Sequence, residues 1–242
     1  MKPKLRVGIG LIVACLLGAG GALAAPDLTD ALSNPALKPA DVIALSQIKP
    51  GDQLADIIAG RFVRAFSQAV GPAGKVYAFE PAEIAKAEPQ VVTIMKGIVA
   101  DPAHANVQLI IQPIDTPQLP AGLDVVFIRQ NYHDLHDKFM GPADVAAFNR
   151  NVFAALKPGG VYIVLDHAAA PGSGLRDTDT LHRIDIAAVK SEVAAAGFVL
   201  EAESPLFANP ADDHTKKVFD PAIQGHTDQF LLRFRKPAGV AH

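Results

Sequence analysis

Short apolar segments alternate with longer amphipathic segments through most of this chain, and this alternation limits the possible folds more than any other feature. The short segments have the composition of buried strands, and in the longer ones apolar residues recur every three or four positions. This order predicts a parallel β-sheet with helices on both faces. We expect strands at residues 53–58, 75–80, 107–111, 123–129, 161–165, 198–203 and 229–235. We expect helices at residues 39–47, 62–70, 82–98 with a break near Pro89, 142–156 and 185–196.

The last two predicted strands, residues 198–203 and 229–235, have no predicted helix between them. Strands joined without a helical crossover pair antiparallel. The predicted fold class is therefore α/β, with a seven-stranded, mostly parallel sheet whose last strand is antiparallel. No internal repeat and no second domain is visible in the sequence, so we expect one domain at residues 39–237, preceded by a polar lead-in at residues 25–38.

Residues 1–24 have the pattern of an export signal. Three basic residues in the first six positions precede an uncharged apolar run, residues 7–23, and the small-x-small sequence Ala22-Leu23-Ala24 closes it. Gly18-Ala19-Gly20-Gly21 inside this run resembles part of a dinucleotide loop, but its flanks are those of an export signal. The sequence therefore predicts a signal peptide at residues 1–24 and a periplasmic or secreted protein.

The only cysteine of the chain, Cys15, lies inside the predicted signal peptide. Ile12-Val13-Ala14-Cys15 resembles a lipoprotein box, so a lipid anchor on Cys15 is the alternative to ordinary cleavage. After cleavage the chain has no disulfide and no thiolate chemistry. No later segment is long and apolar enough to span a bilayer, so we expect no stable membrane insertion.

The charge of the chain argues against a nucleic-acid partner. The sequence has 22 basic and 25 acidic residues, and three of the basic residues belong to the predicted signal peptide, which leaves a net charge of −6. There is also no run of basic residues. We expect a small molecule as the partner, and the sequence does not indicate an oligomeric state.

Several segments of the chain resemble class I S-adenosylmethionine-dependent methyltransferases. The resemblance extends from about Pro39 to Pro237 and implies a Rossmann-like fold with S-adenosylmethionine as cofactor. A segment with the sequence NYHD, at residues 131–134, further resembles a group of exported bacterial predicted methyltransferases. The matching segments are IKPGDQLADI (48–57), VGPAGKVYAFEP (70–81), LKPGGVYIVLD (156–166) and AAAGFVLEAES (194–204).

The loop after the first strand departs from the family pattern, which has an acidic residue, several glycines and an aromatic residue. Here the acidic residue is Asp56 and the aromatic residue is Phe62, and only Gly60 lies between them. The loop is about two residues short and has the bulky Ile58 where small residues are common. It is either a contracted cofactor loop, with Gly60 and the following helix N-terminus facing the ligand, or a turn that no longer binds a cofactor.

The resemblance implies three further cofactor contacts. Glu80 ends the second strand, where the family's carboxylate accepts hydrogen bonds from both ribose hydroxyls. Asp115 matches an acidic residue near the adenine amino group, and Asn131 follows the fourth strand. A solvated strand end is the alternative interpretation of Glu80, and a loop-capping turn is that of Asp115.

Residues 131–137, with the sequence NYHDLHD, form a polar cluster after the fourth strand. Ligands of open α/β sheets bind beyond the carboxyl ends of the strands, where this segment is expected. A methyl acceptor must be aligned and must lose a proton, for which a histidine is suited. We therefore predict catalytic roles for His133 as the first choice of base, His136 as the second, and Asp134. A water-exposed polar turn is the alternative.

Three residues are predicted to contact the substrate: Tyr132, His167 after the fifth strand, and His214. The last lies in the long connection at residues 205–228, which should cover the active face as a lid or form a solvated loop. His182 and Arg183 are either further substrate contacts or surface residues.

The sequence thus predicts a methyltransferase that acts on a small-molecule acceptor with histidine-assisted deprotonation. An exported binding protein with a degenerate cofactor loop is the first alternative. A metal-dependent hydrolase is the second, with ligands from His133, His136, Asp166, His167 and His214, although their spacing matches no strong metal motif and we assign no metal.

If the export signal is cleaved as expected, the mature protein in its native host should begin at Ala25 or Pro26. Mass spectrometry of the isolated protein checks this N-terminus. An intact Met1 would contradict the signal peptide, whereas a diacylated Cys15 would establish the lipoprotein alternative.

Overall fold

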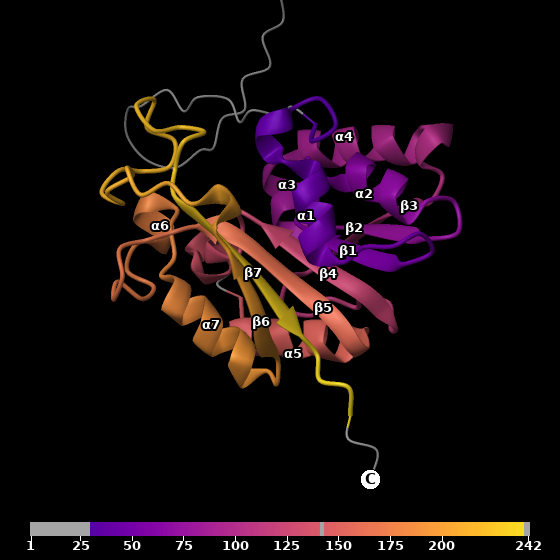
Figure 1. The fold of residues 1–242 in the computed structure, drawn as a ribbon. Helices are drawn as coiled ribbons and strands as arrows, with labels where there is room; N and C mark the ends of the chain where they lie inside the picture. The colour runs from indigo at the N-terminus through magenta and orange to yellow at the C-terminus, as the bar shows by residue number, and fades with distance from the viewer. Residues whose placement is uncertain (1–29, 141–142, 240–242) are drawn as a thin grey trace, which may run out of the picture.

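The computed structural model describes residues 30–140 and 143–239, so the predicted signal peptide and Cys15 lie outside the described part. A seven-stranded sheet with the order β3-β2-β1-β4-β5-β7-β6 forms its centre (Figure 1). Its strands are β1 (Gln53–Ile57), β2 (Lys75–Pro81), β3 (Val107–Gln112), β4 (Leu123–Arg129), β5 (Leu156–His167), β6 (Val199–Ser204) and β7 (Gln229–Arg235).

Strand β7 is antiparallel to both of its neighbours, β5 and β6, and the other neighbouring strands are parallel. This confirms the predicted fold class. The helices are α1 (Pro39–Ser46), α2 (Val63–Val70), α3 (Ala82–Ala87), α4 (Pro89–Ala100), α5 (Val145–Ala155), α6 (Thr178–Leu181) and α7 (Ile186–Ala195). Short 3₁₀ helices are η1 (Pro35–Leu37), η2 (Pro102–His104), η3 (His133–His136), η4 (Lys138–Met140) and η5 (Pro205–Phe207).

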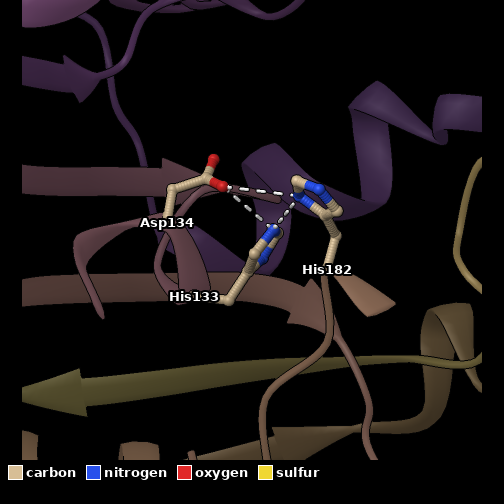
Figure 2. Close-up of side chains that lie close together, drawn as sticks. All are labelled: His133, Asp134 and His182. Carbon is tan, nitrogen blue, oxygen red and sulfur yellow. Dashed lines mark hydrogen bonds and ion pairs between the residues drawn. The ribbon is translucent and has the colours of Figure 1, made fainter. Parts of the chain in front are cut away.

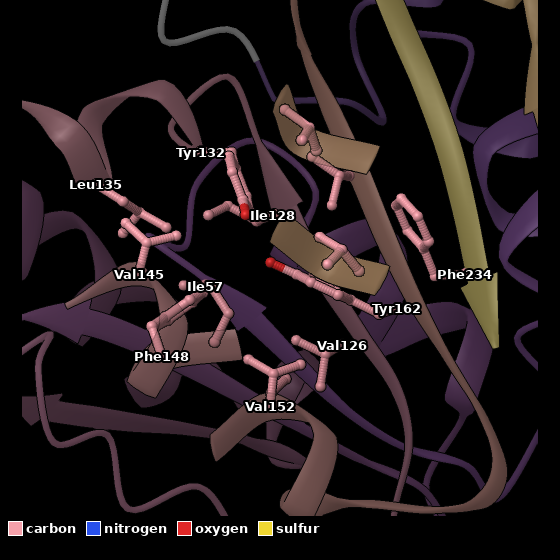
Figure 3. Close-up of a cluster of buried hydrophobic side chains, with 14 of the residues drawn as sticks. Ile57, Val126, Ile128, Tyr132, Leu135, Val145, Phe148, Val152, Tyr162 and Phe234 are labelled. Atoms are coloured by element: carbon pink, nitrogen blue, oxygen red, sulfur yellow. The ribbon is translucent and has the colours of Figure 1, made fainter. Parts of the chain in front are cut away.

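Helices cover both faces of the sheet because the strands are apolar on both sides. Helices α1, α2 and α4 pack on one face, and α5 and α7 pack on the other (Figure 1). We call the hydrophobic core under α1, α2 and α4 the first core, and the core under α5 and α7 the second core. Within β1, Leu54 belongs to the first core and Ala55 to the second, as the alternation of side chains along a strand requires. Figure 3 shows part of the second core, where Phe148 and Val152 of α5 meet the sheet.

Residues 82–98 break at Glu88 into two helices, as expected near Pro89, because the residue before a proline avoids helical backbone angles. Two element boundaries differ from the sequence prediction. Helix α5 begins at Val145 rather than Pro142, because the Asp144 side chain accepts the Ala147 N–H and caps it. Strand β5 begins at Leu156 rather than at residue 161, since Gly159 and Gly160 exchange backbone hydrogen bonds with Lys236.

The carboxyl ends of β1, β2, β4 and β5 meet at one edge of the sheet, and the connection from β6 to β7 returns at the same edge. Arg183 anchors this connection. Its side chain is fully buried and donates hydrogen bonds to the Asp212 carboxylate, the Ala168 carbonyl and the Lys216 carbonyl. The connection at residues 205–228 is therefore fixed to the end of β5.

Among the described residues, no helix is long and apolar enough to cross a bilayer.

The Arg183–Asp212 pair gives a test of this anchoring. Arg183→Met should lower the free energy of unfolding by about 3–5 kcal/mol, because it leaves a buried carboxylate without its cation. Urea denaturation measures this change. Arg176→Met is the matched control, since Arg176 pairs with Asp177 at the surface and should change stability little. Equal effects of the two substitutions would contradict the anchoring role.

Candidate functional site

The loop after β1 has strained backbone at Ile58. Its φ is +54°, in the left-handed region that a β-branched residue rarely adopts. Of the six non-glycine residues with positive φ in the described chain, four lie in segments at the carboxyl edge of the sheet: Ile58, Gln130, His182 and His214. Strain of this kind concentrates at functional sites, so its distribution supports this edge as the candidate site.

Gly60 leaves a stretch of bare backbone in the same loop. Its φ is not positive, and a Cβ added there would meet no described atom within 4 Å beyond its chain neighbours. The Gly60 N–H lies 3.5 Å from Asp56 Oδ2. Neither backbone geometry nor internal packing therefore requires a glycine at this position. An absent side chain leaves space for a ligand to approach the backbone.

Glu80 is a buried carboxyl group without a partner. It ends β2 with no exposed surface, and neither of its oxygens has a hydrogen bond within the described residues. Burial, together with the nearby Asp56 and Glu88 carboxyl groups, raises the pKa of Glu80 to about 9. Buried polar groups of folded proteins are nearly always hydrogen-bonded, so this exception requires an explanation.

Asp56 is buried beside Glu80. Burial raises the pKa of Asp56 to about 8, although the Gly60 amide and the Arg129 charge act in the opposite direction. Both carboxyl groups are therefore protonated at neutral pH in the free protein. The two hydroxyls of a ribose are donors that would satisfy the vacant acceptor positions of Glu80, so the residues present fit an adenosyl cofactor.

A ligand can reach Glu80 only if a neighbouring element moves. Helix α3 follows Glu80 directly, and none of its residues is buried. Its displacement would therefore expose little apolar surface. Two hollows of about 360 and 700 Å³ lie elsewhere, one beside α1 and the other at the amino ends of β1 and β2, and neither includes Glu80.

The polar segment after β4 folds as η3 and turns His133 toward β5. The His133 N–H donates to Asp166 Oδ2 at 2.8 Å, and His133 Nδ1 lies 2.8 Å from Asp166 Oδ1. On the other side of the ring, His133 Nε2 lies 3.2 Å from Asp134 Oδ1 and 3.4 Å from His182 Nδ1. Figure 2 shows these three side chains converging.

The carboxylates around His133 decide its protonation. Burial lowers the pKa of His133, but Asp134 and Asp166 outweigh burial and hold the pKa well above 6.5. For Asp134 the directions are opposite. Burial raises its pKa, but the charge and hydrogen bond of His133 hold the pKa of Asp134 well below its ordinary value. In the protein alone His133 is therefore a cation, which does not favour the base role predicted for it.

His167 has the opposite character. Burial lowers its pKa well below 6.5, and the positive charges of His133 and Arg129 lower it further. His167 Nδ1 lies 2.8 Å from Thr227 Oγ1, which fixes the orientation of the ring. His167 is thus a neutral imidazole that can accept a proton, in contrast to His133.

The other residues predicted for the site have different partners. Tyr132 lies in the core, where its hydroxyl donates to Glu192 and accepts from Asn149 (Figure 3). His136 also contacts Glu192, at 3.2 Å.

Asn131 donates to Asp134 Oδ2 at 2.7 Å, so it supports the histidine cluster. Asp115 accepts the N–H of Asp144, which lies 29 positions further along the chain just before α5. His214 contacts Asp228 within the β6–β7 connection. The sequence analysis missed Glu192, at an ordinary helical position in α7, and Thr227, which contacts His167; neither carries a sequence signal.

Comparison with known proteins supports the fold. No protein-family model matches this sequence, and neither does any curated protein. A SAM-dependent methyltransferase from Aquifex aeolicus has a similar structure, with a TM-score of 0.60, 17% identity, and coverage of 85% of this chain and 95% of the other. N-methyltransferase NodS from Bradyrhizobium japonicum has a TM-score of 0.54, 14% identity, and coverage of 85% and 98%.

The [4+2]-cyclase SpnF is also similar, with a TM-score of 0.56, 18% identity, and coverage of 84% of this chain and 81% of SpnF. The chain therefore has the Rossmann-like fold of class I S-adenosylmethionine-dependent methyltransferases. At these identities the likeness concerns the fold, and the cyclase shows that this fold also occurs in a protein named for another reaction.

The raised pKa of Glu80 predicts how stability depends on pH. Between about pH 4.5 and 9 the folded protein keeps a proton on Glu80 that the unfolded chain releases. Stability should therefore fall as pH rises through this range, by up to about 1.4 kcal/mol per pH unit for this group. Glu80→Gln should remove this contribution, so the variant should gain stability relative to wild type from pH 6 to pH 9.

Urea denaturation at several pH values measures this difference. Glu203→Gln is the control, because Glu203 lies half exposed on β6 and pairs with Lys190. Parallel pH curves for Glu80→Gln and wild type would show that Glu80 is not a neutral buried carboxyl group.

Proposed function

We propose that this protein is an S-adenosylmethionine-dependent methyltransferase that acts on a small-molecule acceptor. The observation that carries this proposal is the buried Glu80 carboxyl group, which has no hydrogen-bond partner in the described chain. It lies at the end of β2, in a fold similar to those of methyltransferases. A nucleoside with two ribose hydroxyls supplies the donors that Glu80 lacks.

The loop after β1 supports a cofactor on the same side of the sheet. Gly60 offers bare backbone, and helix α2 follows with no side chain capping its first turn. The N–H groups at such a helix start are unsatisfied donors that attract polar or negatively charged ligand groups. The carboxylate of the methionyl group is one such ligand group.

Ile58 limits the strength of this binding. It occupies a left-handed backbone position with a branched side chain that packs against the second core. A glycine there would expose backbone, whereas the Ile58 side chain occupies space, and the shortened loop leaves fewer amides to face a ligand. We therefore expect a dissociation constant on the order of 0.1 mM or weaker, compared with micromolar binding for a full loop.

In this proposal His167 removes the proton of the acceptor. It projects from the end of β5 beside the histidine cluster, with its ring held by Thr227. Its lowered pKa keeps it neutral at physiological pH, as a base must be. We therefore propose His167 as the base in place of the cationic His133, while His136 is held by Glu192.

Ile58 also favours a second candidate function, an exported binding protein that keeps the fold without cofactor chemistry. The export signal expected at residues 1–24 agrees with it, since S-adenosylmethionine is made in the cytoplasm. Cofactor binding distinguishes the two candidates.

Calorimetry with S-adenosylhomocysteine tests the proposed cofactor site. A protein in which Ile58-Ala59-Gly60-Arg61 is replaced by a six-residue glycine-rich segment should bind more tightly than wild type. Glu80→Ala in this lengthened background should weaken binding at least tenfold, because two charge-assisted hydrogen bonds contribute about 1.5–3 kcal/mol each. Binding should also release a proton, since the ribose hydroxyls favour the ionised form of Glu80.

Glu203→Ala in the same background is the control, because Glu203 lies on β6 and pairs with Lys190. Micromolar binding by wild type would show that the loop after β1 supports tight cofactor binding without being lengthened. An unchanged affinity in Glu80→Ala would remove Glu80 from the site. Absence of binding in both loop versions would favour the non-catalytic candidate.

A further inference from the structure

The histidine cluster has the geometry of a metal centre. His133 Nε2, Asp134 Oδ1 and His182 Nδ1 lie 3.2, 3.4 and 3.7 Å from one another (Figure 2). Zinc bonds of about 2.0–2.1 Å in tetrahedral geometry put neighbouring ligand atoms about 3.3–3.4 Å apart. The three atoms are thus spaced as three corners of a tetrahedral zinc site.

The chemistry of the three donors agrees with this spacing. Imidazole and carboxylate are ligands of zinc and of other divalent transition metals. His133 and Asp134 are buried, and the His182 side chain keeps 21% of its surface exposed. Three protein ligands leave a fourth position for water or a substrate atom, and the partial exposure of His182 leaves that side open to small molecules.

A second set of residues holds the ligands in place. Asp166 binds His133 Nδ1, which leaves His133 Nε2 for a metal. Asn131 donates to Asp134 Oδ2, which leaves Oδ1 for the same metal. A carboxylate on the far nitrogen of a metal-bound histidine is a recurring arrangement that fixes the ring and strengthens the ligand.

The third ligand comes from a distant segment that is also fixed. His182 has a left-handed backbone, with φ +53°, which ends α6. The next residue is the buried Arg183, and Ile184 exchanges backbone hydrogen bonds with His167 and Ala169 beyond β5. The segment that carries His182 is therefore attached to the same sheet edge as His133.

We propose that His133, Asp134 and His182 bind one divalent transition-metal ion, zinc being favoured by the distances between the ligand atoms. This ligand set differs from the one considered from the sequence, because His136 and His214 contact Glu192 and Asp228 instead. The site itself does not depend on the proposed methyl transfer. If that function holds, the metal would bind an oxygen or nitrogen atom of the acceptor and promote loss of its proton.

Titration of the metal-free full-length protein with Co²⁺ tests this site. We expect one Co²⁺ per chain, with the visible absorption of a tetrahedral ion, and its displacement by Zn²⁺. His182→Ala and Asp134→Ala should each abolish this absorption. Asp166→Asn should keep the stoichiometry but weaken binding about 10–100-fold, because Asp166 orients a ligand without being one.

His136→Ala is the matched control, since it removes a neighbouring histidine on the same 3₁₀ helix without touching the ligand set. Circular dichroism confirms folding of each variant. Failure to bind Co²⁺, or equal binding by His182→Ala and His136→Ala, would overturn the proposal. Because the readout is metal binding alone, it is independent of affinity for S-adenosylhomocysteine.

Discussion

The candidate site depends on one buried carboxylate at the end of β5. Asp166 has no exposed surface and accepts hydrogen bonds from the backbone N–H groups of His133 and His167, while its Oδ1 also contacts the His133 ring. These contacts fix the chain that leaves β4 against the chain that leaves β5. They also orient the His133 ring toward Asp134 and His182. Asp166 therefore joins the turn after β4 to the end of β5 and sets which nitrogen of His133 faces the cluster.

Much of the fold could be predicted from the sequence because burial patterns along strands and helices are local. The positions of the seven strands followed from short apolar runs, and the antiparallel last strand followed from the missing helix before it. The boundaries that were wrong depended on particular contacts. Asp144 caps α5, so this helix begins at Val145 rather than at Pro142, and residues 157–160 extend β5 because they pair with Lys236, which is far away in the sequence.

The candidate site was less predictable, because it also depends on contacts between residues that are far apart in the sequence. Residues 131–137 were recognised because four of them carry imidazole or carboxyl groups close together in the chain. The approach of His182 to His133 was not predictable, because the two residues are 49 positions apart and meet only when Ile184 pairs with the end of β5. The pKa values of His133 and His167 also depend on burial and on neighbouring charges, which shift the two pKa values in opposite directions and cannot be read from the sequence.

At the edge of the sheet where the carboxyl ends of the strands lie, the part around β1 and β2 and the part around β4 and β5 differ in electrostatic character. Around β1 and β2, Asp56 and Glu80 are neutral carboxyl groups in an apolar setting. Around β4 and β5, acidic and imidazole groups lie within hydrogen-bond distance of one another. This division matches a neutral nucleoside on one side and a polar reacting group on the other. The fold brings the halves together, but their side chains determine the chemistry, as the similarity to both methyltransferases and a cyclase illustrates.

The central claim is that the partnerless Glu80 receives the ribose of an adenosyl cofactor. A crystal structure of the protein with S-adenosylhomocysteine at saturating concentration tests it most directly. The account predicts both ribose hydroxyls within hydrogen-bond distance of the Glu80 carboxylate, with α3 or Ile58 displaced from its present position. A nucleoside bound elsewhere, with Glu80 still buried and unpaired, would contradict the account.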